Sequence, residues 1–152
     1  MASTSRRALF AAALAPLEAA TEYASPNEVF AAIDGLEADV ESRLRALAAA
    51  LPSARAFAQS LLRDHARHRG GRASLRQRLK LPVASVSTAA TADDVSLEAL
   101  RVAVEALVYA HAEGLPAVGD AFAVDQLAHD MVDLSRHLTL VQLWIEQEQN
   151  RG

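Results

Sequence analysis

Hydrophobic residues recur along the chain at alternating steps of three and four, the spacing that puts side chains on one face of an α-helix. In the first stretch the spaced positions are Phe30, Ile33, Glu37, Val40, Leu44, Leu47 and Leu51. Ser25 and Pro26 precede this stretch as a typical helix start, and Pro52 follows as a stop. The pattern therefore predicts a helix between Ser25 and Pro52.

A second stretch follows Ser53, which can cap a helix, and ends near Lys80 and Pro82. Its spaced positions are Phe57, Leu61, Asp64, His68, Gly71, Leu75 and Arg78. Steps of three and four thus predict a second helix whose inner face carries charged residues as well as apolar ones.

The third and fourth stretches are separated by a turn at Gly119 and Asp120. Asp94 or Ser96 caps the third helix, whose spaced positions are Leu97, Leu100, Val104, Leu107, His111, Gly114 and Val118. The fourth helix has two adjacent apolar rows that run to about Glu148. These rows include Ala123, Val124, Leu127, Asp130, Met131, Leu134, His137, Leu138, Val141, Trp144 and Ile145.

Four amphipathic helices with mostly short connections predict an all-α fold, an antiparallel four-helix bundle. We expect one bundle domain at residues 26–150, preceded by an N-terminal segment at residues 1–25. The connection from Leu81 to Asp94 is the only long one. It can join adjacent ends of two helices or cross part of the bundle, and the sequence leaves both arrangements open.

The N-terminal segment has two interpretations. Arg6 and Arg7 stand before a short apolar run, a pattern typical of a twin-arginine export signal. The alternative is a short helix that packs on the bundle. The first interpretation predicts a periplasmic protein and the second allows a cytoplasmic one.

Composition and charge exclude several classes of protein. The chain has 152 residues, 51% of them hydrophobic and 22% charged, which is ordinary for a globular domain. It has no cysteine, so disulfides and thiolate metal sites are excluded. The net charge of −4 argues against nucleic-acid binding as the main role. No apolar run reaches the roughly 18 residues of a membrane span.

The candidate chemistry lies in polar residues that interrupt the apolar rows. A buried charge is costly unless it is paired, hydrogen-bonded or bound to a metal. Reflecting each helix pair about its turn brings inward carboxylates and imidazoles of all four helices to one level, provided that the long connection joins adjacent ends. The residues at this level are Glu37, Asp64, His68, His111 and Asp130.

This layer predicts a metal site, because carboxylates and imidazoles are ligands of Fe, Mn, Zn and Cu. We expect Glu37, Asp64, His68, His111 and Asp130 to be ligands and iron to be the favoured ion. Reserve candidates are His65, Glu105, His129 and His137. The alternative is a set of buried ion pairs, Glu37 with His68 and His111 with Asp130, that fix the register of the helices.

Two segments resemble the ferritin-like superfamily, in particular its alanine-rich members with twin-arginine signals. They are His68-Arg69-Gly70-Gly71-Arg72 with Leu75, and Glu105-Ala106-Leu107-Val108-Tyr109-Ala110-His111. The resemblance implies a bundle that binds two metals, with Glu on the first and third helices and Glu-x-x-His on the second and fourth. Glu37 matches this pattern and Glu105 lies near its place. His65 stands where a Glu is expected before His68, and Asp133 precedes His137 by four residues. These departures favour a degenerate site, a single-metal site or a bundle that has lost its metal.

A second hypothesis is a non-catalytic interaction module, and the sequence does not decide whether the protein is an enzyme. The second helix has a basic face made of Arg63, Arg67, Arg69, Arg72, Arg76, Arg78 and Lys80. Such a face is either solvated and paired with neighbouring acids or a contact surface for an acidic partner. The last helix is apolar on more than one side around Leu140, Leu143 and Trp144, which predicts a homodimer or a covering N-terminal segment.

Overall fold

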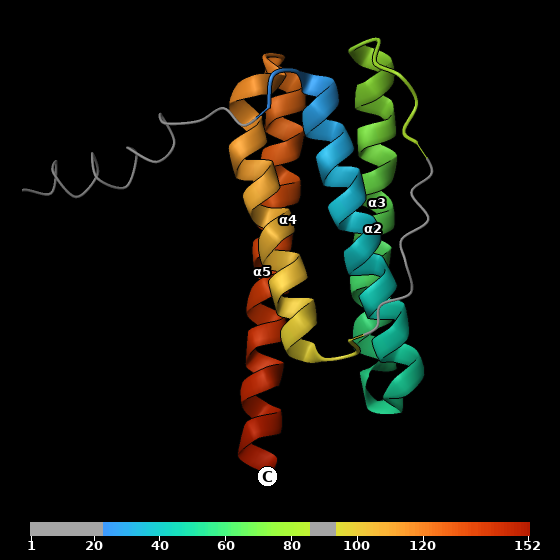
Figure 1. Cartoon of the computed structure of the whole chain (residues 1–152), viewed down its shortest axis with the longest axis vertical. Helices are drawn as coiled ribbons and strands as arrows, with labels where there is room; N and C mark the ends of the chain where they lie inside the picture. The colour runs from blue at the N-terminus through green and yellow to red at the C-terminus, as the bar shows by residue number, and fades with distance from the viewer. Residues whose placement is uncertain (1–22, 86–93) are drawn as a thin grey trace, which may run out of the picture.

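The computed structural model describes residues 23–85 and 94–152, and in these ranges the chain forms four α-helices and one short 3-10 helix (Figure 1). The elements are α2 (Pro26–Ala50), η1 (Pro52–Ala54), α3 (Arg55–Arg78), α4 (Leu97–Val118) and α5 (Ala121–Arg151). The predicted export signal or short helix at Arg6 and Arg7 lies outside the described residues.

Polar side chains cap three of the four helices. Ser25, Ser96 and Asp120 each accept a hydrogen bond from a backbone N–H in the first turn of α2, α4 and α5. Gly119 ends α4 with a positive φ of 71°, a conformation that glycine adopts without strain. The expected cap at Ser53 is wrong. The 3-10 helix η1 runs directly into α3, whose N-cap is Ala54 without a side-chain hydrogen bond.

Each helix packs against two neighbours that run in the opposite direction. α2 lies against α3 and α4, and α5 lies against α4 and α3, so that α2 and α5 are diagonal, as are α3 and α4 (Figure 1). Val29 near the start of α2 meets Gly114 near the end of α4. Arg78 at the end of α3 pairs with Asp120 at the start of α5. These contacts confirm an all-α bundle with antiparallel packing.

The long connection joins opposite ends of the bundle. The carbonyl of Pro82 accepts from Arg76 near the end of α3, whereas the carbonyl of Asp94 accepts from Arg43 in the second half of α2. α3 and α4 are therefore parallel diagonal helices (Figure 1). The layer of site residues predicted from the sequence was conditional on a connection between adjacent ends. The structure does not meet this condition. In this arrangement His111 lies near Arg72. Burial is the main cause of the lowered pKa of His111, and the positive charge of Arg72 lowers this pKa further.

The core of the bundle is apolar, and a group of polar side chains is buried at its middle. The core includes Phe30, Ile33, Leu44, Leu107 and Leu134, each at most 2% exposed. In the described part of the chain, no helix has the length and apolar character needed to cross a membrane. The buried polar middle is the feature that needs a functional explanation.

Candidate metal centre

Four of the chain's five histidines are buried in the middle of the bundle. They are His65 and His68 on α3, His111 on α4 and His137 on α5, and none is more than 1% exposed. Their positions follow from helical spacing, because His65 and His68 lie one turn apart on the face of α3 that also carries Leu61 and Leu75. A cluster of buried imidazoles is costly unless each ring is hydrogen-bonded or binds a ligand.

Glu37 on α2 lies between two of these rings. Its Oε1 is 2.9 Å from Nδ1 of His65 and 3.8 Å from Nδ1 of His68. One potential ligand atom from each of the three residues lies within 4.8 Å of the others. Two imidazoles and one carboxylate at this separation can hold a single transition-metal ion.

Arg72 holds the other oxygen of Glu37. It donates from Nη2 to Oε2 of Glu37 and from Nε to Oδ1 of Asp34, the second contact at 2.8 Å. Arg76 donates to the other oxygen of Asp34 at 2.6 Å. The Glu37 carboxylate is therefore oriented on one side by a buried guanidinium, and its other oxygen, Oε1, faces His65 and His68.

His137 and His68 are each oriented by a carboxylate near the surface. Nε2 of His137 lies 3.0 Å from Oδ2 of Asp64, and Nε2 of His68 lies 3.3 Å from Oδ2 of Asp133. The centre of the His137 ring is 5.3 Å from that of His65 and 6.4 Å from that of His68. His137 is thus the nearest further imidazole to the cluster of Glu37, His65 and His68.

His111 is oriented by its own helix. Its Nδ1 lies 2.8 Å from the carbonyl oxygen of Leu107, which can only accept a hydrogen bond. The proton of the neutral ring therefore sits on Nδ1, and Nε2 has a free electron pair. Asp130 is also buried, and burial raises its pKa. Its Oδ1 accepts from Gln126 at 3.1 Å.

Each of the four buried imidazoles has one nitrogen without a hydrogen-bond partner among the described residues. Burial lowers the pKa of His65, His111 and His137 to about 4, so these three rings are neutral at pH 7. In these three rings, the nitrogen that faces a carboxylate or carbonyl carries the proton. The four nitrogens without such a partner are Nε2 of His65, Nδ1 of His68, Nε2 of His111 and Nδ1 of His137.

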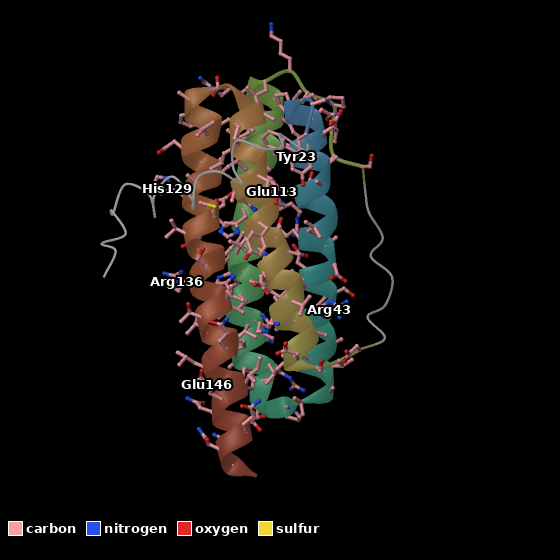
Figure 2. All side chains as sticks on the ribbon, turned by 60° about the vertical axis from the view of Figure 1, so that its left-hand side comes forward. Tyr23, Arg43, Glu113, His129, Arg136 and Glu146 are labelled. Atoms are coloured by element: carbon pink, nitrogen blue, oxygen red, sulfur yellow. The ribbon has the colours of Figure 1, made fainter. Side chains whose placement is uncertain are left out.

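The structure brings most of the expected site residues to the middle of the bundle, with different roles. Glu37 and His68 lie in the group that can hold an ion, and the reserve candidate His65 joins them. Asp64 is half-buried and pairs with His137. Glu105 pairs with Arg101 on the outside of α4, and His129 is 73% exposed on α5, as Figure 2 shows by its outward position.

The inner face of α3 is rotated by one position from the predicted row. His65 and Arg72 are buried where Asp64 and Gly71 were expected to be. The basic face is accordingly not a uniform solvated surface, because Arg72 and Arg76 pair with acids of α2 inside the bundle. Asp34 was missed by the sequence argument. Asp34 lies three residues before Glu37, so helical spacing puts both carboxylates on the same face of α2, and this spacing could have identified it.

Comparisons of the chain with known protein families, with curated proteins and with solved structures find no match.

Proposed function

We propose that the bundle binds one transition-metal ion through Glu37, His65 and His68, with His137 and His111 as the nearest additional imidazoles. The observation that carries this proposal is the set of buried imidazole nitrogens without hydrogen-bond partners beside an oriented carboxylate. Ion pairs that only fix the helix register would use one nitrogen of each ring and would give no role to the other buried nitrogens.

The donor set favours a particular group of metals. Imidazole-rich sites with one carboxylate suit Fe, Zn and Cu, whereas Mg and Ca prefer sites made of oxygen alone. Two histidines and one carboxylate with open positions are the ligand set of many non-haem Fe(II) centres. Iron is therefore our first candidate, for storage, sequestration or redox chemistry.

The helix order supports a ferritin-like bundle as the finer fold assignment. Ferritin-like folds contain one long crossover connection, and here the connection between α3 and α4 joins opposite ends of the bundle. The Glu-x-x-His pattern that the resemblance implies on the second helix is not present in α3, where His65 stands three residues before His68 in place of a glutamate. This composition is the reason that we propose one ion.

Metal content measured by elemental analysis tests the proposal. Protein purified without an affinity tag, and again after loading with Fe(II), Zn(II) or Cu(II), should hold about one ion per chain. Glu37→Gln, His65→Ala and His68→Ala should each abolish stoichiometric binding. His129→Ala removes an exposed histidine and is the matched control. Absence of binding by the loaded wild-type protein, or full binding by all three variants, would overturn the proposal.

A further inference from the structure

The buried cluster is linked to the surface by a continuous row of polar groups between α3 and α5. On the outside, Nη2 of Arg67 lies 2.7 Å from Oδ2 of Asp133 and 3.2 Å from Oδ1 of Asp64. Nη2 of Arg136 lies 3.4 Å from Oδ1 of Asp133. Exposure falls inward along the row, from 62% for Arg67 to 27% for Asp133 and 1% for His68.

The inner half of the row ends at the proposed metal ligands. Asp133 reaches Nε2 of His68 and Asp64 reaches Nε2 of His137, while the opposite nitrogens of these two rings are free and buried. Nδ1 of His68 then faces Oε1 of Glu37 at 3.8 Å. The His68 ring therefore links Asp133 at the surface to Glu37 in the cluster through contacts of 3.3 Å and 3.8 Å.

We propose that a metal ion reaches the cluster through this α3–α5 row, where it is first held by Asp64 and Asp133 after displacing the guanidinium groups of Arg67 and Arg136. The inference rests on the proposed metal binding and adds the route and its surface residues. Figure 2 shows Arg136 on the outer side of α5, at the middle of the bundle's length.

The exposed ion pairs of the two arginines are weak enough for a divalent ion to compete with them. Exposed ion pairs are worth about 0–1 kcal/mol, because water screens them and the long side chains lose entropy. A divalent cation is attracted to the same two carboxylates twice as strongly as one guanidinium group.

A cleft near the cluster is unsuitable for a cation. It has a volume of about 180 Å³ and lies beside Arg72, between α3 and the chain at residues 81–84. Its charged lining consists of Arg69, Arg72 and Arg76 with a single acid, Asp34. Both oxygens of Asp34 already accept from Arg72 and Arg76. The cleft therefore repels a cation, whereas the α3–α5 row offers two carboxylates to it.

The rate of Co(II) uptake tests the route. Chelator-treated protein is mixed with Co(II), and the visible absorption of the bound ion gives the association rate constant from initial rates over a range of concentrations. Arg67→Gln with Arg136→Gln removes two repelling charges and should raise this rate constant about tenfold at low salt. Asp133→Asn should lower it by a similar factor. The double arginine variant should still bind about one ion per chain.

The chain contains a matched control on another helix. Arg101 on α4 pairs with Glu98 and Glu105, so it has the same arrangement of one arginine between two acids, and it lies outside the buried cluster. Arg101→Gln should leave the rate constant unchanged. Val83→Trp, which narrows the cleft beside Arg72, should also have no effect.

The outcomes separate this inference from the proposed function. Full Co(II) loading with equal rate constants in all variants, or slower uptake in Val83→Trp alone, overturns the α3–α5 route and leaves the metal site standing. A wild-type protein that binds no Co(II) overturns both. Faster uptake after removal of Arg67 and Arg136, slower uptake in Asp133→Asn and an unchanged Arg101→Gln support the route.

Discussion

Nε2 of His137 lies 3.0 Å from Oδ2 of Asp64, and this contact fixes which nitrogen of the buried ring is free. A carboxylate can only accept, so the proton sits on Nε2 and Nδ1 keeps its electron pair inside the bundle. Metal-bound histidines commonly have such a partner, which sets the tautomer and the direction of the ring. Asp64 was expected to be a ligand, and its place behind His137 suits an orienting role.

Replacing Asp64 by Asn should weaken metal binding without changing its stoichiometry. The amide of Asn can donate as well as accept, so it no longer fixes the tautomer of His137, and loss of such a partner lowers metal affinity by about 10- to 100-fold. Competition with a chelator of known affinity measures the change. Asp125→Asn is the control, because Asp125 pairs with the exposed His129. Equal affinities in both variants would remove His137 from the site.

The metal-free protein should lose stability as the pH falls from about 6.5 to about 4. His65, His111 and His137 have a pKa of about 4 in the folded chain because burial disfavours the charged ring, against about 6.5 in the unfolded chain. Between these values the unfolded chain binds more protons, so the free energy of unfolding rises with pH across the interval. Each histidine contributes on the order of 1 kcal/mol per pH unit.

Denaturant unfolding at a series of pH values measures this dependence. His111→Gln should reduce the slope, because it removes one of the three groups. His129→Ala should not reduce it, since His129 is exposed and its pKa is raised by the carbonyl and charge of Asp125. A free energy of unfolding that stays constant from pH 7 to pH 5 would show that folding does not lower the pKa of the buried rings.

The close contact of α2 with α4 depends on the absence of a side chain at Gly114. A Cβ at this position would lie 2.4 Å from Cγ1 of Val29, a distance that forces the helices or the valine to move. Gly114→Ala should destabilise the protein by about 1–3 kcal/mol, measured by thermal or denaturant unfolding. Adding Val29→Ala should make the double variant less destabilised than the sum of the two single changes.

Gly70→Ala is the matched control for this clash. Gly70 lies in α3, and a Cβ there would meet nothing within 4 Å. The substitution should stabilise the helix by up to about 1 kcal/mol, because alanine has the higher helix propensity. Equal effects of the two substitutions would mean that α2 and α4 are not packed as closely as the structure has them.

The sequence predicted the helices well because each has its own local signals. Ser96, Gly119 and Asp120 were assigned as boundary residues from chemistry that acts within one turn. The parallel relation of α3 and α4 could not be predicted, since residues 81–94 are compatible with either path. The export signal stays a prediction. The homodimer also stays a prediction, and the apolar side chains on which it depends include Leu140 and Leu143, which are 39% and 49% exposed on α5.

The site was predicted in kind but not in detail, because one position of rotation changes which side chain points inward. On α3 the apolar row continued equally well through Asp64 or His65, and the partner helix decides between them. Glu37 of α2 accepts hydrogen bonds from His65 and from Arg72, one on each oxygen. The face of α3 that carries His65 and Arg72 is therefore the one that satisfies this buried carboxylate. Such a long-range pairing leaves no periodic signal in the sequence.

The pairing of Glu37 with Arg72 gives the last prediction. Arg72→Met leaves the buried Glu37 carboxylate without its cation and should cost about 3–5 kcal/mol of stability. Glu37→Gln together with Arg72→Met should cost less than the sum of the single changes, because no unpaired charge remains.

A bound divalent ion can replace the lost cation beside Glu37. Metal should therefore raise the midpoint of thermal unfolding more in Arg72→Met than in the wild type, and it should have no effect on the double variant, which lacks the carboxylate. Thermal unfolding with and without one equivalent of Zn(II) measures all three forms. An equal metal-induced shift in the wild type and in the double variant would contradict a site at Glu37, because the ion would then be bound elsewhere.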